Sequence, residues 1–342
     1  MATEMLSHHM ENQQPMRRNK GIIIAIIALI AIVTLGFGIW FATDHTEWIP
    51  TDYTENDEED LIVYDGKKYQ YNEHLSNYLF LGVDKREVSD EEKNPGTAGQ
   101  ADSILLVSYD RVKNTIKCIS IPRDTMTFIR TFSQEGVDLG KSKDHLNIQY
   151  AFGDGKDKSC NLMKEAVEGL LYGVPVRGYC ALSMDGIPAA VEAVGQVELV
   201  VPDDTLVDVN PEFKKGNTVL LTKENTEQFV RYRDIEIRQS AMDRGNRQKV
   251  FVKAFVETAR EKAAQDEGLV TTIYEKLRPY MVTNIGNDIF VKLLQAKNES
   301  GEMFVDIPGE TVNGTDFDEY HVNSDELYEL VLQMFYKEVQ ED

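Results

Sequence analysis

The spacing of apolar residues divides the chain into one long uncharged run and a series of shorter segments. Residues 21–42 read GIIIAIIALIAIVTLGFGIWFA, 22 residues without a charge. At about 1.5 Å per residue such a helix is roughly 33 Å long, which matches a hydrocarbon core of about 30 Å. The run predicts an uncleaved transmembrane signal anchor. A cleaved signal peptide, whose apolar part is usually shorter, is the alternative.

The charges on either side of this run predict its orientation. The basic cluster RRNK at 17–20 directly precedes it, and acidic residues follow it. The positive-inside rule therefore places residues 1–20 in the cytoplasm, as a short tail, and the rest of the chain outside the cell membrane. The stretch DYTENDEED at 52–60 has six acids and no base. We therefore expect an acidic extracytoplasmic linker over 43–76.

Strand-like and helix-like patterns alternate from about residue 77 onward. Short apolar runs predict strands over 78–84, 103–109, 115–121, 197–201 and 303–307. Apolar residues at helical spacing predict helices over 161–171, 187–194 and 246–264. A last helix is expected near the C-terminus, with Ser324 as its N-cap.

The order of these elements favours a single α/β domain. The five residues 110–114 are enough for a hairpin loop, so the sheet should be mixed. Strands interleaved with helices predict an α-β-α sandwich, in which a central mixed sheet is flanked by helices on both faces. We expect this domain to span 77–342, with its core over 77–264 and a C-terminal extension over 265–342.

Charge and cysteine content exclude several classes of protein. The 342 residues include 36 Lys and Arg against 58 Asp and Glu, a formal net charge of −22. A chain this acidic is a poor nucleic-acid binder, because affinity for phosphate comes from basic surface. Three cysteines are too few for a disulfide scaffold or a zinc ribbon, although two of them could pair outside the cell. The glycine-rich loops that bind nucleotides and the Ser-His-Asp pattern are not legible.

Two aspartates stand at the ends of neighbouring predicted strands. Asp84 closes the first strand and Asp102 opens the second. If the two strands are antiparallel neighbours, or if the loop between them folds back, both carboxylates can reach one point. Mg²⁺ suits such a pair, because it keeps several waters and seldom needs a cage made only of protein ligands. The alternative is that both are ordinary cap or turn residues.

The segment Ile121-Pro122-Arg123-Asp124 ends the third predicted strand. Pro122 stops the hydrogen bonding of the strand, so that the next two side chains extend beyond the sheet edge. The Arg123 guanidinium could bind phosphate oxygens as a fork. Asp124 could orient a guanidinium or accept a proton from an attacking hydroxyl. A local Arg–Asp surface pair is the alternative.

A basic cluster at 231–249 stands out in this acidic chain. It holds six bases against three acids. Arg231 and Arg233 are two residues apart, and in an extended segment they would face the same way. Arg244, Arg247 and Gln248 lie at the approach to the longest predicted helix, whose first N–H groups add partial positive charge. A pyrophosphate would neutralise this concentration of guanidinium groups. The alternative is a solvated helix start with ordinary ion pairs.

Taken together, these segments resemble the LytR-CpsA-Psr (LCP) family of bacterial cell-wall ligases. The resemblance covers about residues 77–264, and the matching pieces follow the order of the family: LFLGVDKRE, GQADSILLVSYD, IKCISIPRDT, HLNIQYAFG, DGIPAAVEAVGQVELVVP, FVRYRD and RGNRQKVF. It implies the LCP fold, with an apolar tunnel for a polyprenyl chain. Candidate lining residues lie near 167–171 and 250–255.

The resemblance also implies roles for individual residues. Asp84 and Asp102 would hold Mg²⁺, for which Mn²⁺ is the substitute. Arg123 and Asp124 would be the catalytic residues. The pyrophosphate would be bound by a larger set of side chains: Arg86, Arg123, Arg231, Arg233, Arg244, Arg247 and Gln248.

The implied enzyme is an extracytoplasmic phosphotransferase. It would move an anionic or capsular cell-wall glycopolymer, such as a teichoic acid, from an undecaprenyl-pyrophosphate carrier onto peptidoglycan. A sugar hydroxyl would attack, undecaprenyl phosphate would leave, and metal and guanidinium groups would neutralise charge. A polyprenyl-pyrophosphate phosphatase and a non-catalytic binder of wall lipid or glycan are the alternatives.

Three places depart from the usual pattern of the family. Gln100 stands where members often have a basic residue, and His145 replaces the usual lysine of the HLN motif. Ala241 and Met242 stand near the place of an acid. These changes bear on the substrate polymer rather than on the reaction class. If His145 contacts phosphate, binding should weaken as the ring loses its proton near about pH 6.5.

Overall fold

The structure is a computed structural model that describes residues 54–56, 61–86, 94–234, 240–299, 303–314 and 317–339. The predicted anchor at 21–42 lies outside these residues. Within the described ranges, no helix is both long enough and apolar enough to cross a membrane.

The centre of the fold is a seven-stranded mixed sheet with the order β12-β9-β4-β5-β6-β13, in which β14 also pairs with β6. Neighbours β4 and β5 are antiparallel, as are β5 and β6, whereas β9 runs parallel to β4. The predicted hairpin and the predicted mixed sheet are therefore both present. The strands are β4 (Leu75–Val83), β5 (Ala101–Asp110), β6 (Thr115–Ile121), β9 (Gly178–Ser183), β12 (Met281–Thr283), β13 (Lys297–Asn298) and β14 (Phe304–Asp306).

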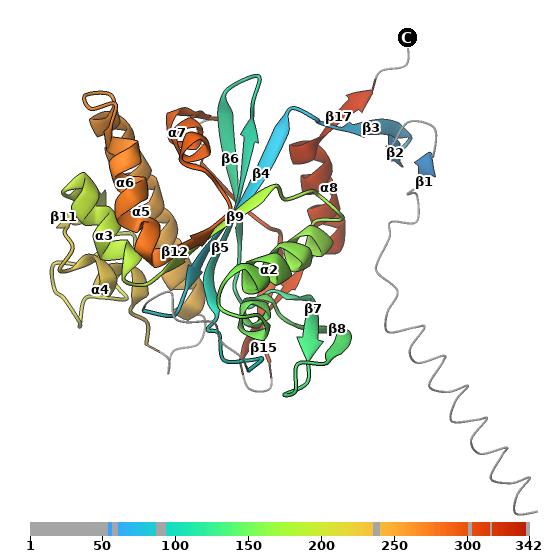
Figure 1. Cartoon of the computed structure of the whole chain (residues 1–342), viewed down its shortest axis with the longest axis horizontal. Helices are drawn as coiled ribbons and strands as arrows, with labels where there is room; N and C mark the ends of the chain where they lie inside the picture. The colour runs from blue at the N-terminus through green and yellow to red at the C-terminus, as the bar shows by residue number, and fades with distance from the viewer. Residues whose placement is uncertain are drawn as a thin grey trace, which may run out of the picture. The chain divides into compact units, whose positions relative to one another are not determined.

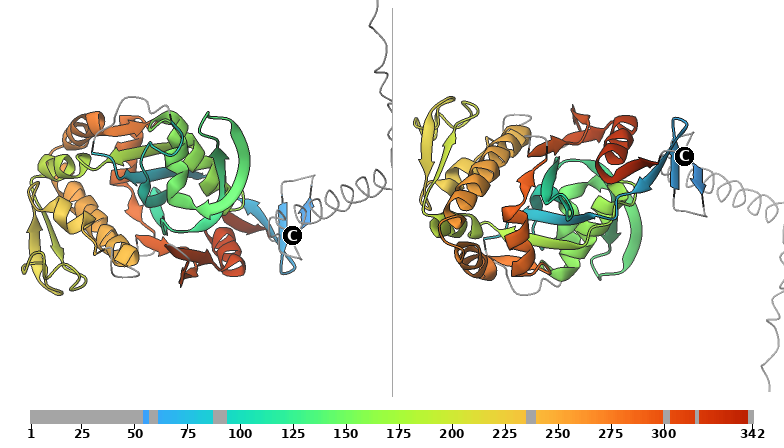
Figure 2. Two further views of the ribbon diagram at one scale, coloured as in Figure 1. Left: turned by 90° about the horizontal axis from the view of Figure 1, so that it is seen from below. Right: turned by 90° about the horizontal axis from the view of Figure 1, so that it is seen from above.

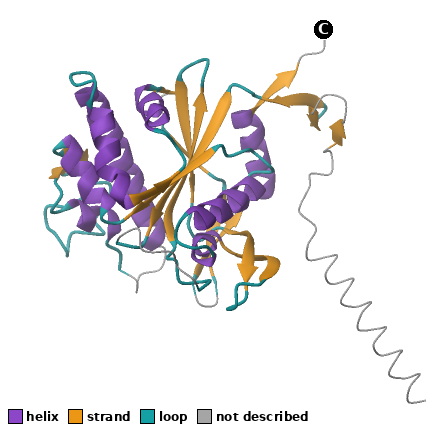
Figure 3. Cartoon of the chain, in the orientation of Figure 1, coloured by secondary structure: helices purple, strands orange, loops and turns teal. Residues whose placement is uncertain are grey.

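Helices cover both faces of this sheet, as Figures 1 and 3 show. One face carries α3 (Gly186–Val194), α5 (Ser240–Ala263), α6 (Leu269–Leu277) and α7 (Asn287–Gln295); the other carries α2 (Asp157–Leu170) and α8 (Ser324–Phe335). The alternation along β4 explains the two layers, because successive side chains of a strand point to opposite faces. Leu79 packs in the core with α2 and α8, whereas Tyr78 and Phe80 pack with residues of α7.

Smaller sheets and short helices complete the domain (Figure 2). Among the described residues, three two-stranded sheets lie outside the central sheet: β7 (Met126–Phe132) with β8 (Asp138–His145), β10 (Val197–Val200) with β11 (Thr218–Leu221), and β15 (Gly309–Asn313) with β16 (Asp318–Val322). A separate sheet has the order β1-β2-β3-β17, formed by Thr54–Asn56, Leu61–Tyr64, Lys67–Tyr71 and Tyr336–Val339. The short helices are η1 (Leu146–Phe152), α4 (Thr226–Arg231) and η2 (Arg278–Tyr280).

The domain boundaries differ from those expected from the sequence. Residues 61–76, assigned to the linker, contain β2, β3 and the first residues of β4. The partner of β3 is β17, with Tyr71 opposite Tyr336, so a local pattern could not reveal the pairing. The boundary at residue 265 also has no counterpart, because β12, β13 and β14 all join the central sheet.

Two predicted elements are present but placed differently. The strand predicted at 197–201 forms as β10, yet it pairs with β11 instead of joining the central sheet. The last helix is capped by Asn323, whose side chain accepts a hydrogen bond from the backbone N–H of Glu326. Ser324 is therefore the first residue of the helix rather than its cap.

Candidate active site

Asp84 and Asp102 lie at the same end of the central sheet. Because β4 and β5 are antiparallel with Val83 opposite Ala101, the residue after β4 and the second residue of β5 are brought to one edge. Both aspartates line a single cavity of about 350 Å³. The sequence left two ways for the carboxylates to meet, antiparallel neighbouring strands or a loop that folds back, and the sheet provides the first.

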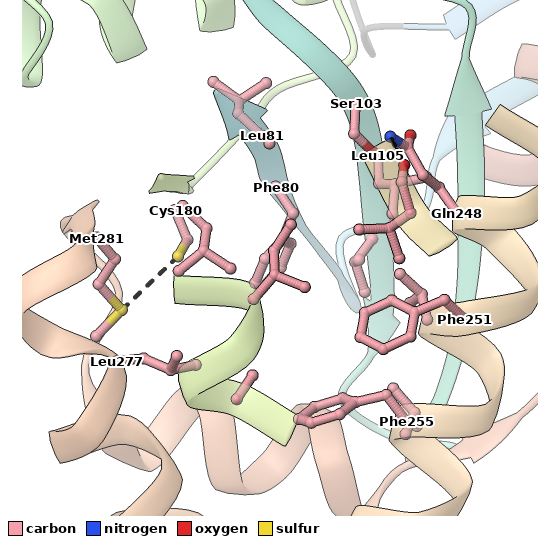
Figure 4. Close-up of a pocket in the computed structure, with 18 of the residues that line it drawn as sticks. Phe80, Leu81, Ser103, Leu105, Cys180, Gln248, Phe251, Phe255, Leu277 and Met281 are labelled. Atoms are coloured by element: carbon pink, nitrogen blue, oxygen red, sulfur yellow. Dashed lines mark hydrogen bonds between the residues drawn. The ribbon is translucent and has the colours of Figure 1, made fainter. Parts of the chain in front are cut away.

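The cavity lies between the sheet and the helices α3, α5, α6 and α7. Figure 4 shows Phe251 and Phe255 of α5 among its walls, together with Cys180 of β9 and Met281. Apart from one end, which carries Asp84, Asp102, Ser103, Arg231, Arg244 and Gln248, its lining is mainly aliphatic and aromatic. An apolar cavity with a cluster of polar groups at one end suits an amphipathic ligand.

Two segments were expected to line an apolar tunnel for a polyprenyl chain, and one of them lines this cavity. Phe251, Val252 and Phe255 of the segment 250–255 face the cavity. The segment 167–171 does not, because Val167 and Leu171 are fully buried in the core on the opposite face of the sheet. Helical spacing showed that both helices have an apolar side but could not show which face of the sheet each one covers.

Arg123 is held directly after β6, at the same sheet edge. β6 ends at Ile121, and Pro122 interrupts the ladder as expected. The Arg123 guanidinium donates to Asp102, to Asp124 Oδ1 at 3.0 Å and to Gln100 Oε1 at 2.8 Å. The residue is therefore fixed on three sides in a pocket where its side chain is only 16% exposed.

Arg244, in the second turn of α5, has a buried guanidinium that is only partly satisfied. Its Nη1 lies 3.0 Å from Asp102 Oδ2, while its Nε and Nη2 are buried without a hydrogen-bond partner among the residues that the structure describes. Burial lowers the pKa of Arg244, and Asp102 opposes that effect. An arginine remains charged in proteins, and buried donors without acceptors cost free energy. An anionic ligand at this end of the cavity would supply the missing acceptors.

Gln100 connects the two aspartates through Arg123. Its backbone N–H donates to Asp84 Oδ1 at 2.6 Å, and its Oε1 accepts from both Arg123 and Asn147 Nδ2. Gly99 makes the approach possible, since it has a φ of +91° and a Cβ there would lie 2.7 Å from Asp84 Oδ1. The sequence analysis noted Gln100 only as a departure from the family and did not assign a contact to Asn147.

Arg231 and Arg86 share one carboxylate at the polar end of the cavity. Arg231 Nη1 lies 2.6 Å from Glu227 Oε1, and Arg86 Nη2 lies 3.3 Å from the same oxygen. Arg86 also pairs with Asp185 at 3.3 Å. Arg231 is the last residue of α4 rather than part of an extended segment, so its expected alignment with Arg233 does not occur.

The remaining residues of the basic cluster separate into different environments. Gln248 lines the cavity, and its Nε2 donates to Val230 O at 3.2 Å. Arg233 is partly buried and has no hydrogen-bond partner within the described ranges. Arg247 is 1% exposed and donates to Phe229 O, Tyr232 O and Thr205 Oγ1. The structure thus places Arg247 outside the cavity, where it holds protein carbonyls instead of a ligand.

His145 is likewise occupied by protein atoms. Its Nδ1 lies 3.1 Å from Asp144 Oδ1, and its Nε2 lies 3.2 Å from Asp318 O. Its ring also packs edge-on against Phe317. Neither ring nitrogen is therefore left for a phosphate in this geometry, so the structure does not provide the phosphate contact considered for His145.

The polar end of the cavity can accommodate a divalent cation that takes most of its ligands from elsewhere. Where the structure describes the chain, no group of three or more His, Cys, Asp or Glu could hold a metal alone. Asp84 Oδ2 has no described protein partner, whereas both oxygens of Asp102 face arginines. Mg²⁺ binds through one or two carboxylates together with water and substrate phosphates. The two aspartates fit that requirement if a phosphate is present.

Comparison with known sequences identifies what the chain is similar to. Residues 43–339 match the model of the LytR_cpsA_psr family. The chain is 30% identical over 215 residues to polyisoprenyl-teichoic acid–peptidoglycan teichoic acid transferase TagV of Bacillus subtilis (strain 168), a match that covers 60% of this chain and 49% of the relative. It is also 30% identical over 219 residues to the transferase TagU of Bacillus cereus (strain AH820), covering 63% of each protein. The chain thus spans from half to under two thirds of the length of these curated relatives.

Solved structures share the fold. The crystal structure of B. subtilis TagV superposes with a TM-score of 0.58 at 23% identity, covering 77% of this chain and 96% of that one. The structure of TagT bound to LI-WTA superposes with a TM-score of 0.55 at 19% identity, covering 77% and 92%. At these identities the structures establish the α/β architecture alone.

Proposed function

The chain belongs to the LytR-CpsA-Psr family, and from that premise we propose that it is a phosphotransferase that moves a glycopolymer from a polyprenyl-pyrophosphate carrier onto peptidoglycan. The observation that carries the proposal is the position of Arg244. Two of its guanidinium nitrogens are buried without partners where an apolar cavity meets a cluster of charged groups. A lipid pyrophosphate matches both halves of this site.

The polyprenyl chain would occupy the apolar part of the cavity. Side chains from the sheet and from α5, α6 and α7 would replace water around it, as Figure 4 shows for Phe80, Phe251 and Phe255. Burial of apolar surface contributes about 25 cal/mol per Å², so a long lipid can be held without any specific contact. Specificity would then come from the headgroup.

The pyrophosphate would lie among Arg244, Arg123 and Arg231. Arg244 would donate from Nε and Nη2, the two nitrogens that lack acceptors. Guanidinium groups bind phosphate oxygens as planar forks and favour the charge that develops during phosphoryl transfer. Asp84 and Asp102 would hold Mg²⁺, which supplies neutralisation of phosphate charge when it is bound.

The reaction would proceed by attack on the phosphorus that bears the glycopolymer. An oxygen of a peptidoglycan sugar hydroxyl forms the new P–O bond, and the bond to the bridging oxygen breaks. Polyprenyl monophosphate leaves with that oxygen and its electron pair. The hydroxyl proton passes to Asp124, whose Oδ1 is held by Arg123 and whose second oxygen has no described partner. No nucleotide is needed, because the pyrophosphate is the activated bond.

We further propose an anionic polymer of the teichoic acid class as the substrate and a place outside the cell membrane for the reaction. The names of TagV and TagU support the first point. The second rests on the apolar run 21–42 as a signal anchor, with residues 1–20 in the cytoplasm. The lipid carrier and the glycan acceptor would then meet at the outer face of the cell membrane.

A direct assay tests the proposal. Full-length protein in detergent is incubated with Mg²⁺ and a polyprenyl-pyrophosphate-linked teichoic acid precursor, with and without peptidoglycan oligomers. Transfer predicts polyprenyl monophosphate together with polymer linked to the glycan by a phosphodiester. Release of monophosphate at the same rate without acceptor would instead show a phosphatase. No turnover, with the lipid still bound, would show a binding protein.

A further inference from the structure

Glu227 occupies two arginines that the proposed function assigns to the substrate. It lies in the first turn of α4, one helical turn before Arg231. Its Oε1 accepts from Arg231 Nη1 at 2.6 Å and from Arg86 Nη2 at 3.3 Å. One carboxylate oxygen therefore joins the end of α4 to the segment that follows β4.

The backbone fixes both sides of this contact. The N–H groups of Met184 and Asp185 donate to Lys85 O and Arg86 O, which ties the Arg86 segment to the start of α3. Thr226, fully buried, donates from its hydroxyl to Thr222 O in the residues before α4. The three side chains meet because two anchored segments, α4 and the residues after β4, converge.

One of the two arginines in this contact also lines the cavity. Arg231 lines its polar end together with Arg244 and Gln248. A carboxylate and a phosphate use the same donors of a guanidinium fork, so Glu227 and a ligand phosphate compete for Arg231 and Arg86. The pairs are accessible, with side chains 30% exposed for Glu227 and 42% for Arg231, and partly exposed ion pairs are weak. A ligand can therefore displace Glu227.

The competition affects substrate and product differently. A pyrophosphate has two phosphoryl groups, so one can satisfy Arg244 while the other displaces Glu227 from the outer arginines. A monophosphate has a single phosphoryl group and cannot hold both sets at once. When the product remains, Glu227 regains Arg231 and Arg86.

We propose that Glu227 is a specificity-determining residue, an internal carboxylate that competes with the second phosphoryl group of a pyrophosphate and so limits the preference of the site for pyrophosphate over monophosphate. The inference rests on the proposed function, since it assumes that the outer arginines bind the headgroup. In this role Glu227 lowers the affinity of the outer arginines for an anion.

The experiment compares the wild type with Glu227→Gln in the full-length protein, using calorimetric binding of inorganic pyrophosphate and of inorganic phosphate. Removal of the charge should tighten pyrophosphate binding about three- to tenfold and phosphate binding by less, so that the ratio of the affinity for pyrophosphate to that for phosphate rises. In turnover assays KM should fall, because the substrate no longer has to displace a carboxylate. A structural role alone would not tighten binding.

Two further variants make the result specific. Asp185→Asn releases Arg86 from its second partner and should shift the ratio in the same direction by a smaller factor. Glu192→Gln removes a carboxylate that pairs with Lys223 and Lys276, away from these arginines, and should leave both affinities unchanged.

The outcomes separate the two proposals. If the wild type binds pyrophosphate and Glu227→Gln binds both anions with unchanged or weaker affinity, the role of Glu227 is refuted while the phosphotransferase proposal stands. If Asp185→Asn alone changes the ratio, the role belongs to Asp185 and the inference is also refuted. If the wild type binds no pyrophosphate at all, both proposals fall.

Discussion

Arg244 Nη1 lies 3.0 Å from Asp102 Oδ2, while the opposite oxygen of the same aspartate accepts from Arg123. Asp102 therefore stands between two guanidinium groups that would otherwise repel each other in a buried space. It balances only part of their charge and leaves two of the three Arg244 guanidinium nitrogens without a partner among the described residues. The proposed function assigns the missing acceptors to a substrate pyrophosphate.

Substitution of Arg244 tests this organisation most directly. Arg244→Gln removes the charge and the unpartnered donors, and hydrogen bonds to charged groups contribute about 1.5–3 kcal/mol each. We expect kcat/KM for a polyprenyl pyrophosphate to fall about 100-fold or more. Thermal unfolding should change little, because the variant removes buried donors that lack partners. A variant with undiminished kcat/KM would contradict the assignment of this residue.

Arg247 gives the contrasting case, three residues further along α5. Arg247→Met removes the hydrogen bonds that Arg247 donates to Phe229 O, Tyr232 O and Thr205 Oγ1. It also removes the ion pair with Asp203. Loss of one partner from a buried charged network costs about 3–5 kcal/mol. We therefore expect a clear loss of stability in urea unfolding. If the variant is as stable as the wild type yet fails to bind pyrophosphate, Arg247 would be a ligand after all.

Asp84 should control the metal requirement. Chelation with EDTA is expected to abolish turnover, and Mg²⁺ should restore it. Asp84→Asn keeps an oxygen that can accept from Gln100 N but loses the negative charge. We expect it to require at least about tenfold more Mg²⁺ for half-maximal activity, because Mg²⁺ favours carboxylate oxygens. An identical Mg²⁺ titration for Asp84→Asn and the wild type would exclude Asp84 as a ligand.

The size of the cavity should matter for the lipid and not for the headgroup. Ala190 of α3 is buried and lines the apolar part of the cavity. Ala190→Phe places a ring in the space proposed for the polyprenyl chain. It should weaken binding of farnesyl pyrophosphate by about tenfold or more while inorganic pyrophosphate binds as before. Equal losses for both ligands would indicate a general distortion instead.

The cavity thiols give a prediction for alkaline pH. Burial raises the pKa of Cys118 and of Cys180 to about 12, above the ordinary value of 9.0. The folded protein retains these protons where the unfolded chain loses them, so their contribution to stability is complete below about pH 9 and is lost as pH rises toward 12. The difference in stability between the wild type and Cys118→Ala, measured by urea unfolding, should shrink over that range. A constant difference would show that the thiol is not shielded.

The meeting of the two aspartates could be predicted from the sequence, whereas the roles of the arginines around them could not. Antiparallel strands with an aspartate at each end are a local pattern, and Asp84 and Asp102 meet as expected. Arg244 and Arg247 were indistinguishable in sequence, because both lie near the start of one helix. Their different roles depend on Asp102 and on the loop at Thr205, which reach them only through tertiary packing.

Other features could not be obtained from local patterns at all. Glu227 reads as an ordinary polar residue of a short helix, and only the convergence of Arg86 and Arg231 gives it significance. The helix 157–170 and the helix 240–263 both have an apolar side, yet only the second borders the cavity. The choice of sheet face is a property of the chain topology, which periodicity does not encode.

The pairing of β3 with β17 has a consequence for biosynthesis. Residues 67–71 are made long before their neighbour in the sheet, 336–339. Contacts of such high sequence separation form slowly, and here they cannot form before residues 336–339 have been made. A stop codon upstream of residue 336 would thus release a nascent chain with an open edge on β3, a natural point for quality-control proteases to distinguish finished from unfinished molecules.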